Sequence, residues 1–411
     1  MEPNGIIRGI ATADLHLGID NVGGVNAYGL PARVDDYFDA LDQIIGMAFR
    51  EGADLFIIAG DLTRHRNPPQ RIAAPFLYRV RALIDKGITP VLVRGNHDGD
   101  SGNGQSNLLD TAEVLGAFVF NEPASMTVTL AGDRKVRLVG IPWPRLGRAD
   151  ARDLDELTNA ADAAVRQTIV RAVLPPDMDE GPQVLIGHLA VAGADRASDQ
   201  WMTLGYEPLV RASDFPVTLD LVLLGHYHKP GVIKGGSTLA VYCGSPITID
   251  FGEEGQEKVA WRFVLNPREP AGARCVDLTP FTVRGRPFQT IDLDLADLIA
   301  PDLVTVAAID AIRQAGVAEG AVVRLRITCR AAAQAGALDL GRIGTVLRDT
   351  AAWDVAGITV DAPRAERRWG GDGLTGRPPE EILREYLERT EADPERRTRL
   401  YGLAMGLKGE A

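Results

Sequence analysis

The sequence contains little cysteine and no long apolar run. Its 411 residues include three cysteines, Cys243, Cys275 and Cys329, which are odd in number and widely spaced. Such a set fits neither a disulfide framework nor a zinc cluster, so we expect a reducing cytoplasm. No segment approaches the roughly eighteen apolar residues that a membrane helix needs, which argues against insertion into a membrane. Residues 1–18 lack the charged and apolar stretches of a signal peptide, and we expect none.

An excess of positive charge is also absent. The chain has 44 Lys and Arg against 56 Asp and Glu, a formal net charge of −12. This balance argues mildly against a protein that coats nucleic acid through bulk positive charge. Local binding stays open, because carboxylates are needed to hold metals and bound divalent cations reverse the local sign.

Short apolar runs alternate with longer helix-periodic stretches over residues 6–266. The order starts as βαβαβ and continues with several strands and fewer helices. It predicts an α/β fold in which two packed mixed β-sheets are flanked by helices. We assign this domain to residues 1–270. Its main expected elements are helices at 34–49 and 72–86 and strands at 6–12, 54–59, 90–94, 136–141, 184–186, 219–224, 239–242 and 259–264.

Two smaller units are expected after this domain. Strand and helix patterns between residues 278 and 362 predict a small α+β domain of a common size. A connector rich in glycine and proline follows at residues 370–379. Residues 380–391 and 394–407 then read as two amphipathic helices, and we treat residues 375–411 as a separate C-terminal part.

Five of the six histidines lie in short polar blocks that each follow an apolar run or expected strand. The blocks are Asp14-Leu15-His16, Gly60-Asp61, Gly95-Asn96-His97-Asp98, Gly187-His188 and Gly225-His226-Tyr227-His228. A lone Gly-Asp or Gly-His is weak evidence, since either is common in turns. Five blocks in this order, at the ends of strands where α/β enzymes place their chemistry, are typical of a two-metal phosphoesterase.

The blocks supply the ligands that a pair of divalent metals needs, which are one bridging carboxylate with oxygen and imidazole donors around it. Asp61 directly follows its strand and is the obvious bridge. Asp14 and His16, two residues apart on an extended segment, can point the same way. His97 has no necessary metal role and is the candidate general acid or phosphate-stabilising residue. The remaining candidate ligands are Asn96, His188, His226 and His228.

These blocks make the chain resemble the calcineurin-like metallophosphoesterases and, within them, the SbcD family of nuclease subunits that process DNA double-strand breaks in bacteria. The segments that carry the resemblance are 13–18, 59–62, 94–98, 223–230, 242–246 and 249–254. The last two lie outside the candidate ligands and are more typical of the nuclease branch than of phosphatases. The resemblance implies the four-layer metallophosphoesterase fold.

The resemblance also implies a division of the ligands. One metal would be held by Asp14, His16, Asp61 and His228, and the other by Asp61, Asn96, His188 and His226. The implied metal is manganese and the implied substrate is DNA ends. The implied activity is a double-strand exonuclease or single-strand endonuclease, and the residues leave open which of the two dominates.

One position departs from the family pattern. Many archaeal and eukaryotic members place a histidine three residues after the bridging aspartate, where it assists catalysis. Here Arg64 occupies that position and His65 follows it. Either side chain could face the scissile phosphate, or His65 could be an ordinary loop residue, which is the interpretation we favour slightly.

The rest of the chain also has an interpretation within this family. Residues 278–362 would form a capping domain, and residues 375–411 would dock on an SMC-like ATPase of the SbcC type. No Gly-x-x-x-x-Gly-Lys-Ser/Thr loop occurs, so ATP binding would come from that partner. A homodimer is implied, through the helices at 34–49 and 72–86. Two alternatives stay open: a phosphatase or cyclic-nucleotide phosphodiesterase on the same scaffold, and a DNA-tethering scaffold with a vestigial metal site.

Overall fold

The computed structural model describes residues 5–19, 21–99, 107–144, 154–173, 181–194, 207–295, 300–363, 377–390 and 393–408. It divides the chain into two compact units. The first comprises Met1–Leu293, Thr305–Ile327 and Asp339–Thr359, and the second comprises Asp294–Val304, Thr328–Leu338 and Val360–Ala411. The predicted division at residues 1–270, 278–362 and 375–411 stays a prediction.

Two six-stranded sheets form the framework of the described part of the first unit. The first sheet has the order β14-β13-β1-β2-β3-β4, and its strands β1 to β4 run parallel while β13 and β14 are antiparallel. Its strands are β1 (Ile7–Thr12), β2 (Leu55–Ile58), β3 (Thr89–Val93), β4 (Phe118–Phe120), β13 (Val259–Leu265) and β14 (Cys275–Thr282).

The second sheet has the order β11-β12-β10-β7-β6-β5 and is also mixed. Strands β6, β7, β10 and β12 are parallel, and β5 and β11 are antiparallel to their neighbours. Its strands are β5 (Ala124–Thr129), β6 (Lys135–Ile141), β7 (Gln183–His188), β10 (Leu221–Gly225), β11 (Gly231–Val232) and β12 (Ala240–Tyr242). A small separate sheet pairs β8 (Ala190–Val191) with β9 (Leu209–Val210).

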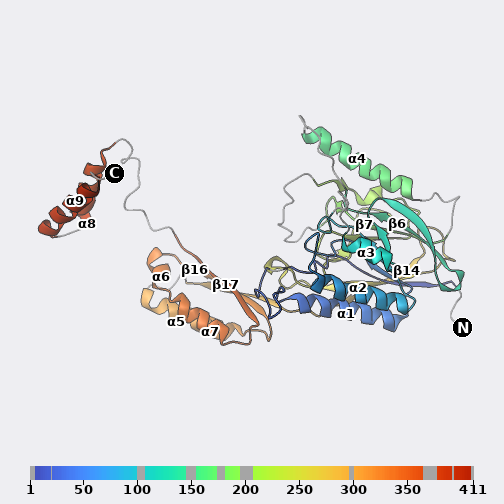
Figure 1. Ribbon diagram of the computed structural model, residues 1–411, viewed down its shortest axis with the longest axis horizontal. Coiled ribbons are helices and arrows are strands. Elements are labelled where there is room, and N and C mark those ends of the chain that lie inside the picture. Colours follow the sequence, from blue (N-terminus) through green and yellow to red (C-terminus); the bar gives the residue numbers. More distant parts are fainter. Residues whose placement is uncertain are drawn as a thin grey trace. The chain divides into compact units, whose positions relative to one another are not determined.

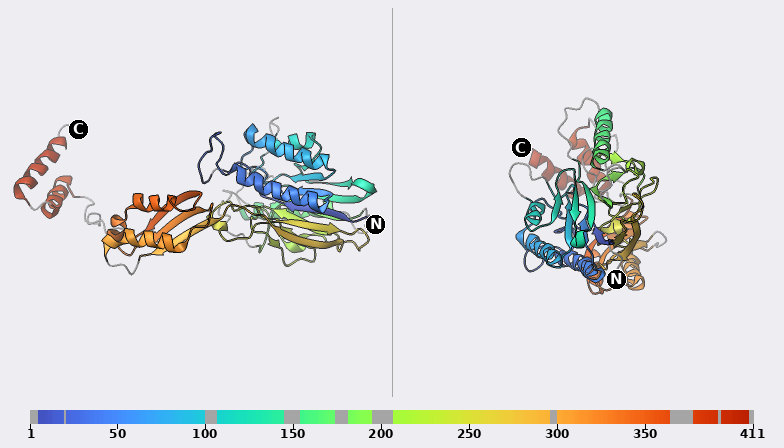
Figure 2. Two further views of the ribbon diagram at one scale, coloured as in Figure 1. Left: turned by 90° about the horizontal axis from the view of Figure 1, so that it is seen from below. Right: turned by 90° about the vertical axis from the view of Figure 1, so that its right-hand side faces the viewer.

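The two sheets pack face to face with helices on their outer faces (Figures 1 and 2). Side chains alternate along each strand, so Ile57 of β2 lies in the core between the sheets while Phe56 packs under the helices. Helices α1 (Val34–Glu51), α2 (Gln70–Asp85) and α3 (Leu108–Val114) cover the first sheet, and α4 (Leu154–Ala172) covers the second. The predicted fold of two mixed sheets flanked by helices is confirmed.

A three-stranded sheet of order β15-β16-β17 follows in sequence. Its strands and the helices between them are β15 (Phe288–Asp294), α5 (Val304–Ala315), β16 (Val322–Thr328), α6 (Ala332–Ala337), α7 (Leu340–Arg348) and β17 (Asp354–Asp361). In the second unit, α8 (Pro379–Thr390) packs against α9 (Pro394–Lys408). Among the described residues, no helix is both long and apolar enough to cross a membrane.

Candidate metal centre

The candidate site lies where five parallel strands of the two large sheets end. Because β1, β2 and β3 are parallel, the segments that follow them emerge at the same edge of the first sheet, and β7 and β10 do the same in the second. The structure brings the predicted residues together at these ends: Asp14 and His16 after β1, Asp61 after β2, Asn96 and His97 after β3, His188 at the end of β7, and His226 and His228 after β10.

The backbone at these strand ends is strained. Five described non-glycine residues have a positive φ, and four of them belong to the site: Asp14 at 51°, His16 at 42°, Asp61 at 48° and His226 at 99°. Left-handed backbone costs a non-glycine residue about 1–3 kcal/mol and clusters at functional sites. The strain turns these side chains toward the shared edge of the sheets.

Asp61 lies at the centre of the group. Its Oδ2 atom is 3.6 Å from Nε2 of His16, 3.5 Å from Nε2 of His188 and 3.9 Å from Nε2 of His97. Its Oδ1 atom accepts a hydrogen bond from the backbone N–H of His97 at 2.8 Å. The Asp61 carboxylate therefore faces His16 and His188, which belong to different predicted metal positions.

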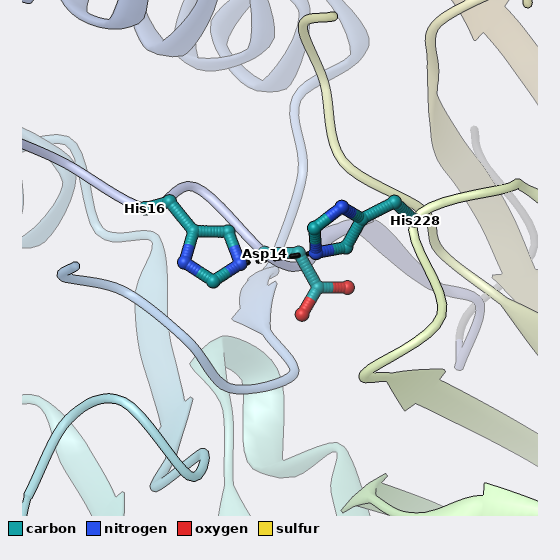
Figure 3. A group of neighbouring side chains, drawn as sticks. All are labelled: Asp14, His16 and His228. Atoms are coloured by element: carbon teal, nitrogen blue, oxygen red, sulfur yellow. Dashed lines mark hydrogen bonds between the residues drawn. The ribbon is translucent and has the colours of Figure 1, made fainter. Parts of the chain in front are cut away.

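The first cluster consists of Asp14, His16 and His228 (Figure 3). One ligand atom from each lies within 4.8 Å of the others, and all three residues are buried. The Nε2 atoms of His16 and His228 are 3.0 Å apart. The Asp14 carboxylate also accepts the backbone N–H of His226 at 3.1 Å, which ties β1 to β10.

The second cluster is built around His188, whose Nε2 lies 2.9 Å from Oδ1 of Asn96. His188 forms a compact group with Asp14 and Asp61, with one ligand atom from each within 4.8 Å of the others. The ring of His226 lies beside that of His188, with 5.3 Å between the centroids. Nε2 of His226 contacts a carboxylate oxygen of Glu207, a residue that the sequence did not single out.

The donor set fits divalent cations. Nδ1 of His188 lies 2.9 Å from the carbonyl oxygen of Ala59 and must carry a proton to bond it. Nδ1 of His228 likewise faces a carboxylate oxygen of Glu253 at 2.6 Å. In the neutral tautomer that these bonds select, each Nε2 presents a lone pair to the site. In that tautomer the Nε2 lone pairs and the carboxylate oxygens point into the same space. A divalent cation there would accept the lone pairs and neutralise the carboxylate charge.

Protonation in the cluster follows the same geometry. Burial raises the pKa of Asp14 to about 7. Burial also opposes ionisation of Asp61 and His188, but their mutual attraction outweighs it, so the pKa of Asp61 is lowered and that of His188 is raised to about 9. Metal binding requires neutral histidine, so a bound cation would take the place of the His188 proton beside Asp61.

His97 and Arg64 form a pair at the edge of the site. The His97 side chain is 27% exposed, and Nη1 of Arg64 lies 3.4 Å from both of its ring nitrogens. Burial lowers the pKa of His97. His65 is exposed, and its backbone carbonyl accepts the hydroxyl of Thr63 at 3.0 Å. Arg64, rather than His65, therefore shares the site with His97.

Several side chains at the site were missed by sequence reasoning. Trp143 lies just after β6. The centroid of its indole is 4.6 Å from the ring centroid of His226 and 6.0 Å from that of His188. Burial opposes ionisation of Glu253, but its bond to His228 and the charge of Lys258 lower its pKa to about 2. Asp98, inside a predicted block, accepts the backbone N–H groups of Gly95 and Thr63 and so shapes the turn.

The chain matches a family profile and several named relatives. The family profile described as calcineurin-like phosphoesterase matches residues 7–230. The chain is 29% identical over 274 residues to the SbcD subunit of nuclease SbcCD from Bacillus subtilis, covering 64% of this chain and 68% of that protein. It is 26% identical over 265 residues to the protein of the same name from Escherichia coli K12, covering 61% and 63%.

A similar match is found to a protein named for DNA double-strand break repair. The chain is 29% identical over 296 residues to Mre11 of Haloferax volcanii, covering 70% of this chain and 55% of that protein. The alignments to Mre11 of Haloferax and to the SbcD subunit of Escherichia coli thus span less than two thirds of those relatives. The crystal structure of the calcineurin-like phosphoesterase YfkN from Bacillus subtilis covers 76% of this chain and 97% of that one, with TM-score 0.36 and 14% identity.

Proposed function

The chain belongs to the calcineurin-like phosphoesterase family, and from this we propose that it is a manganese-dependent nuclease that hydrolyses phosphodiesters at DNA ends. The observation that carries the proposal is the position of Asp61, whose Oδ2 faces Nε2 of His16 on one side and Nε2 of His188 on the other. The names of its relatives, which are a subunit of nuclease SbcCD and the DNA double-strand break repair protein Mre11, support DNA as the substrate.

In this proposal Asp61 is shared between two metal positions. Asp14, His16 and His228 complete the first set, and Asn96, His188 and His226 complete the second. Cations held by these two sets would lower the pKa of a water molecule and place positive charge beside the phosphoryl oxygens. Glu253 and the Ala59 carbonyl orient the rings of His228 and His188 from behind.

His97 has a separate role in the proposal. Its exposed edge and its distance of 3.9 Å from Asp61 leave it beside the shared carboxylate and open to a ligand. From there it can donate a proton to the leaving oxygen or bind the phosphate. The Arg64 guanidinium next to it adds positive charge where the phosphate would lie.

Partners are also proposed from the relatives. Two of these relatives are named as subunits, which implies a complex, and we propose an SMC-like ATPase of the SbcC type that binds α8 and α9 and supplies ATP binding. Leu400 and Leu403, three residues apart in α9, are 38% and 60% exposed, and neighbouring exposed apolar side chains of this kind support a binding surface there. Deletion of residues 375–411 should abolish co-purification with the ATPase.

We also propose a homodimer that uses α1 and α2, which light scattering of the purified protein tests.

A cleavage assay on the purified full-length protein tests the nuclease proposal. With Mn²⁺ we expect degradation of linear duplex DNA, abolished in His97→Ala, while His97→Ala still binds Mn²⁺ in calorimetry. His65→Ala is the matched control, because the neighbouring His65 side chain is exposed. Activity on small phosphomonoesters alone would show that the protein is a phosphatase and not a nuclease. Inertness toward both substrates with metal bound would favour a scaffold.

A further inference from the structure

His228 is held from behind by a buried carboxylate with several partners. Glu253 is 1% exposed, and its Oε1 faces Nδ1 of His228 at 2.6 Å. Its Oε2 accepts Nζ of Lys258 at 2.6 Å and the backbone N–H of Ile249 at 2.8 Å. Ser245 joins the network through its hydroxyl, 2.9 Å from Lys258. With both oxygens engaged, the position of Glu253 fixes the orientation of the His228 ring.

Glu253 belongs to a short, tightly bonded turn. The 3₁₀ turn η5 spans Phe251–Glu253 and begins after Asp250, whose side chain accepts the N–H of Gly252 at 2.7 Å. The backbone N–H of Glu253 also bonds the carbonyl of Asp250 at 3.1 Å. These bonds fix the backbone of residues 250–253, so the Cα positions of Glu253 and its sequence neighbours are coupled.

The other side chains of this turn contact the three-stranded sheet. The Glu254 carboxylate accepts the backbone N–H of Thr290 in β15 at 2.7 Å and also its hydroxyl. Phe251 packs edge-to-face on Phe288 of β15, with 4.8 Å between the centroids. The guanidinium of Arg324 in β16 lies 4.3 Å from the Phe251 ring, and its Nε donates to the Thr290 hydroxyl at 2.9 Å. All these residues lie in the first unit.

We propose that η5 and Glu254, the residue directly after it, act as a strut that ties His228 to strands β15 and β16, so that Glu254 is a positioning residue for the metal centre. The inference rests on the proposed metal site, because it concerns the orientation of one of its ligands. Glu253 and Glu254 are consecutive, and one holds the ligand while the other holds the sheet. A displacement of β15 therefore reaches the His228 ring through two side chains and one peptide bond.

Variants of Glu254 test the strut, with Mn²⁺ affinity measured by calorimetry and the EPR signal of bound Mn²⁺. Glu254→Ala should weaken the metal site that contains His228 by up to about tenfold, the lower end of the loss typical of removing a residue that bonds a ligand directly, because Glu254 acts only through Glu253. Glu254→Gln keeps an oxygen acceptor for the Thr290 N–H and should restore most of the affinity. Glu253→Gln is the positive reference and should weaken the same site.

Glu257 offers a matched control for these variants. It follows on the same loop and also bonds a threonine hydroxyl, that of Thr282 at 2.6 Å. Glu257→Ala should leave both Mn²⁺ affinities unchanged. If Glu254→Ala unfolds the protein, Thr290→Val removes the hydroxyl contacts to Glu254 and Arg324, keeps the backbone N–H bond to Glu254, and should weaken the same metal site. Wild-type affinity at both sites in a folded Glu254→Ala or Thr290→Val protein overturns the inference.

Failure of the strut and failure of the proposed function give different results. If the wild-type protein binds two Mn²⁺ ions but does not cleave DNA, the nuclease proposal fails while the affinity comparison still decides the strut. If the wild-type protein cleaves DNA and Glu254→Ala binds Mn²⁺ unchanged, only the strut fails. If the wild-type protein binds no divalent metal, both are overturned, and the calorimetry of the wild-type protein alone reveals it.

Discussion

At the scale of single residues, the site depends on a few positions that accept only one kind of side chain. Gly60 follows β2 with φ of 95°, and a Cβ atom there would lie 2.1 Å from Nδ1 of His188. That nitrogen bonds the Ala59 carbonyl and so aims the imidazole into the site. The glycine therefore permits both the turn and the close approach of the histidine.

Gly60→Ala should disrupt the His188 position. We expect a loss of about 1–3 kcal/mol in the free energy of unfolding, from backbone strain and the clash, together with weaker Mn²⁺ binding. Gly87→Ala is the control, because Gly87 also has a positive φ of 75° but a Cβ there meets nothing within 4 Å. Urea unfolding and calorimetry measure both effects. Equal metal affinity in the two variants would show that the approach of His188 is unimportant.

Arg64 and His65 should differ sharply in their contribution to activity. Arg64 lies 3.4 Å from the ring nitrogens of His97, while the His65 side chain is exposed. Removing a positioned charge that stabilises a developing negative charge costs about 10²-fold in kcat, so Arg64→Ala should lose about that much. His65→Ala should retain the wild-type kcat. Steady-state cleavage of duplex DNA measures kcat for both variants. A larger loss in His65→Ala than in Arg64→Ala would assign the phosphate contact to His65.

Site residues could be predicted where a short sequence motif marks them, and not where only distant parts of the chain bring them together. The blocks from Asp14 to His228 could be found because each combines a strand end with a short motif. Glu207 and Trp143 lie in no such block, and Glu253, although it lies in the segment 249–254 that carries the resemblance, was given no role. Glu253 lies 25 residues after His228 in the sequence, and only the packed sheets bring their side chains to 2.6 Å. Tertiary contacts of that kind leave no trace in local spacing.

At the scale of elements, helices α1 and α2 and most buried strands of the large sheets were predicted, while α4 and the shortest strands were not. The apolar stripe predicted a helix over 34–49, and α1 extends over Val34–Glu51, where Gly52 ends it in the left-handed conformation. Strands β8, β9 and β11 contain two residues each, too few to show any periodicity. Their pairing follows from the fold around them.

The α1–α2 contact offers a test at this scale. Arg79 of α2 bonds both carboxylate oxygens of Asp42 in α1, at 2.7 and 2.6 Å, and its guanidinium lies 4.5 Å from the ring of Phe38. Arg79→Ala should lower the free energy of unfolding by about 1 kcal/mol, since it removes a bidentate ion pair and a cation–π contact together. Urea denaturation measures the change.

Arg81 provides the comparison for that variant. Its partner is Asp85, four residues later in the same helix, and both side chains are more than half exposed. Such pairs contribute about 0.3–0.5 kcal/mol, so Arg81→Ala should lose less than Arg79→Ala. Equal losses in the two variants would mean that the bond between the helices adds nothing beyond an exposed surface pair.

At the scale of the whole molecule, the sequence indicated the order of the parts more readily than their boundaries. Strand β14 runs to Thr282 and pairs with β13 in the first large sheet, so the chain leaves that sheet close to the start of β15 at Phe288. The linking segment, residues 283–287, is short and contains a single glycine and a single proline, fewer than the connector at residues 370–379. A change of composition therefore could not mark where one sheet ends and the next begins.

Metal binding should stabilise the whole first unit, because the proposed ligands come from both large sheets. Asp14 and Asp61 follow strands of the first sheet, while His188 lies at the end of a strand of the second and His228 follows another, so a cation held by them would cross-link the two layers. It would also neutralise carboxylates that are fully or almost fully buried. A ligand present at a hundred times its Kd adds about 2.7 kcal/mol to the free energy of unfolding, which corresponds to roughly 5–10 °C in Tm for a domain of this size.

Thermal unfolding of the full chain in EDTA and in excess Mn²⁺ measures this effect, and we expect the higher Tm with metal. Asp61→Asn should lose most of the shift, because the neutral amide can no longer bridge two cations. Asp85→Asn, a change of the same kind at an exposed helix position, should keep the full shift. A wild-type Tm that is the same in EDTA and in Mn²⁺ would contradict a metal centre that joins the two sheets. A full Tm shift in Asp61→Asn would show that Asp61 is not the ligand shared by the two metal positions.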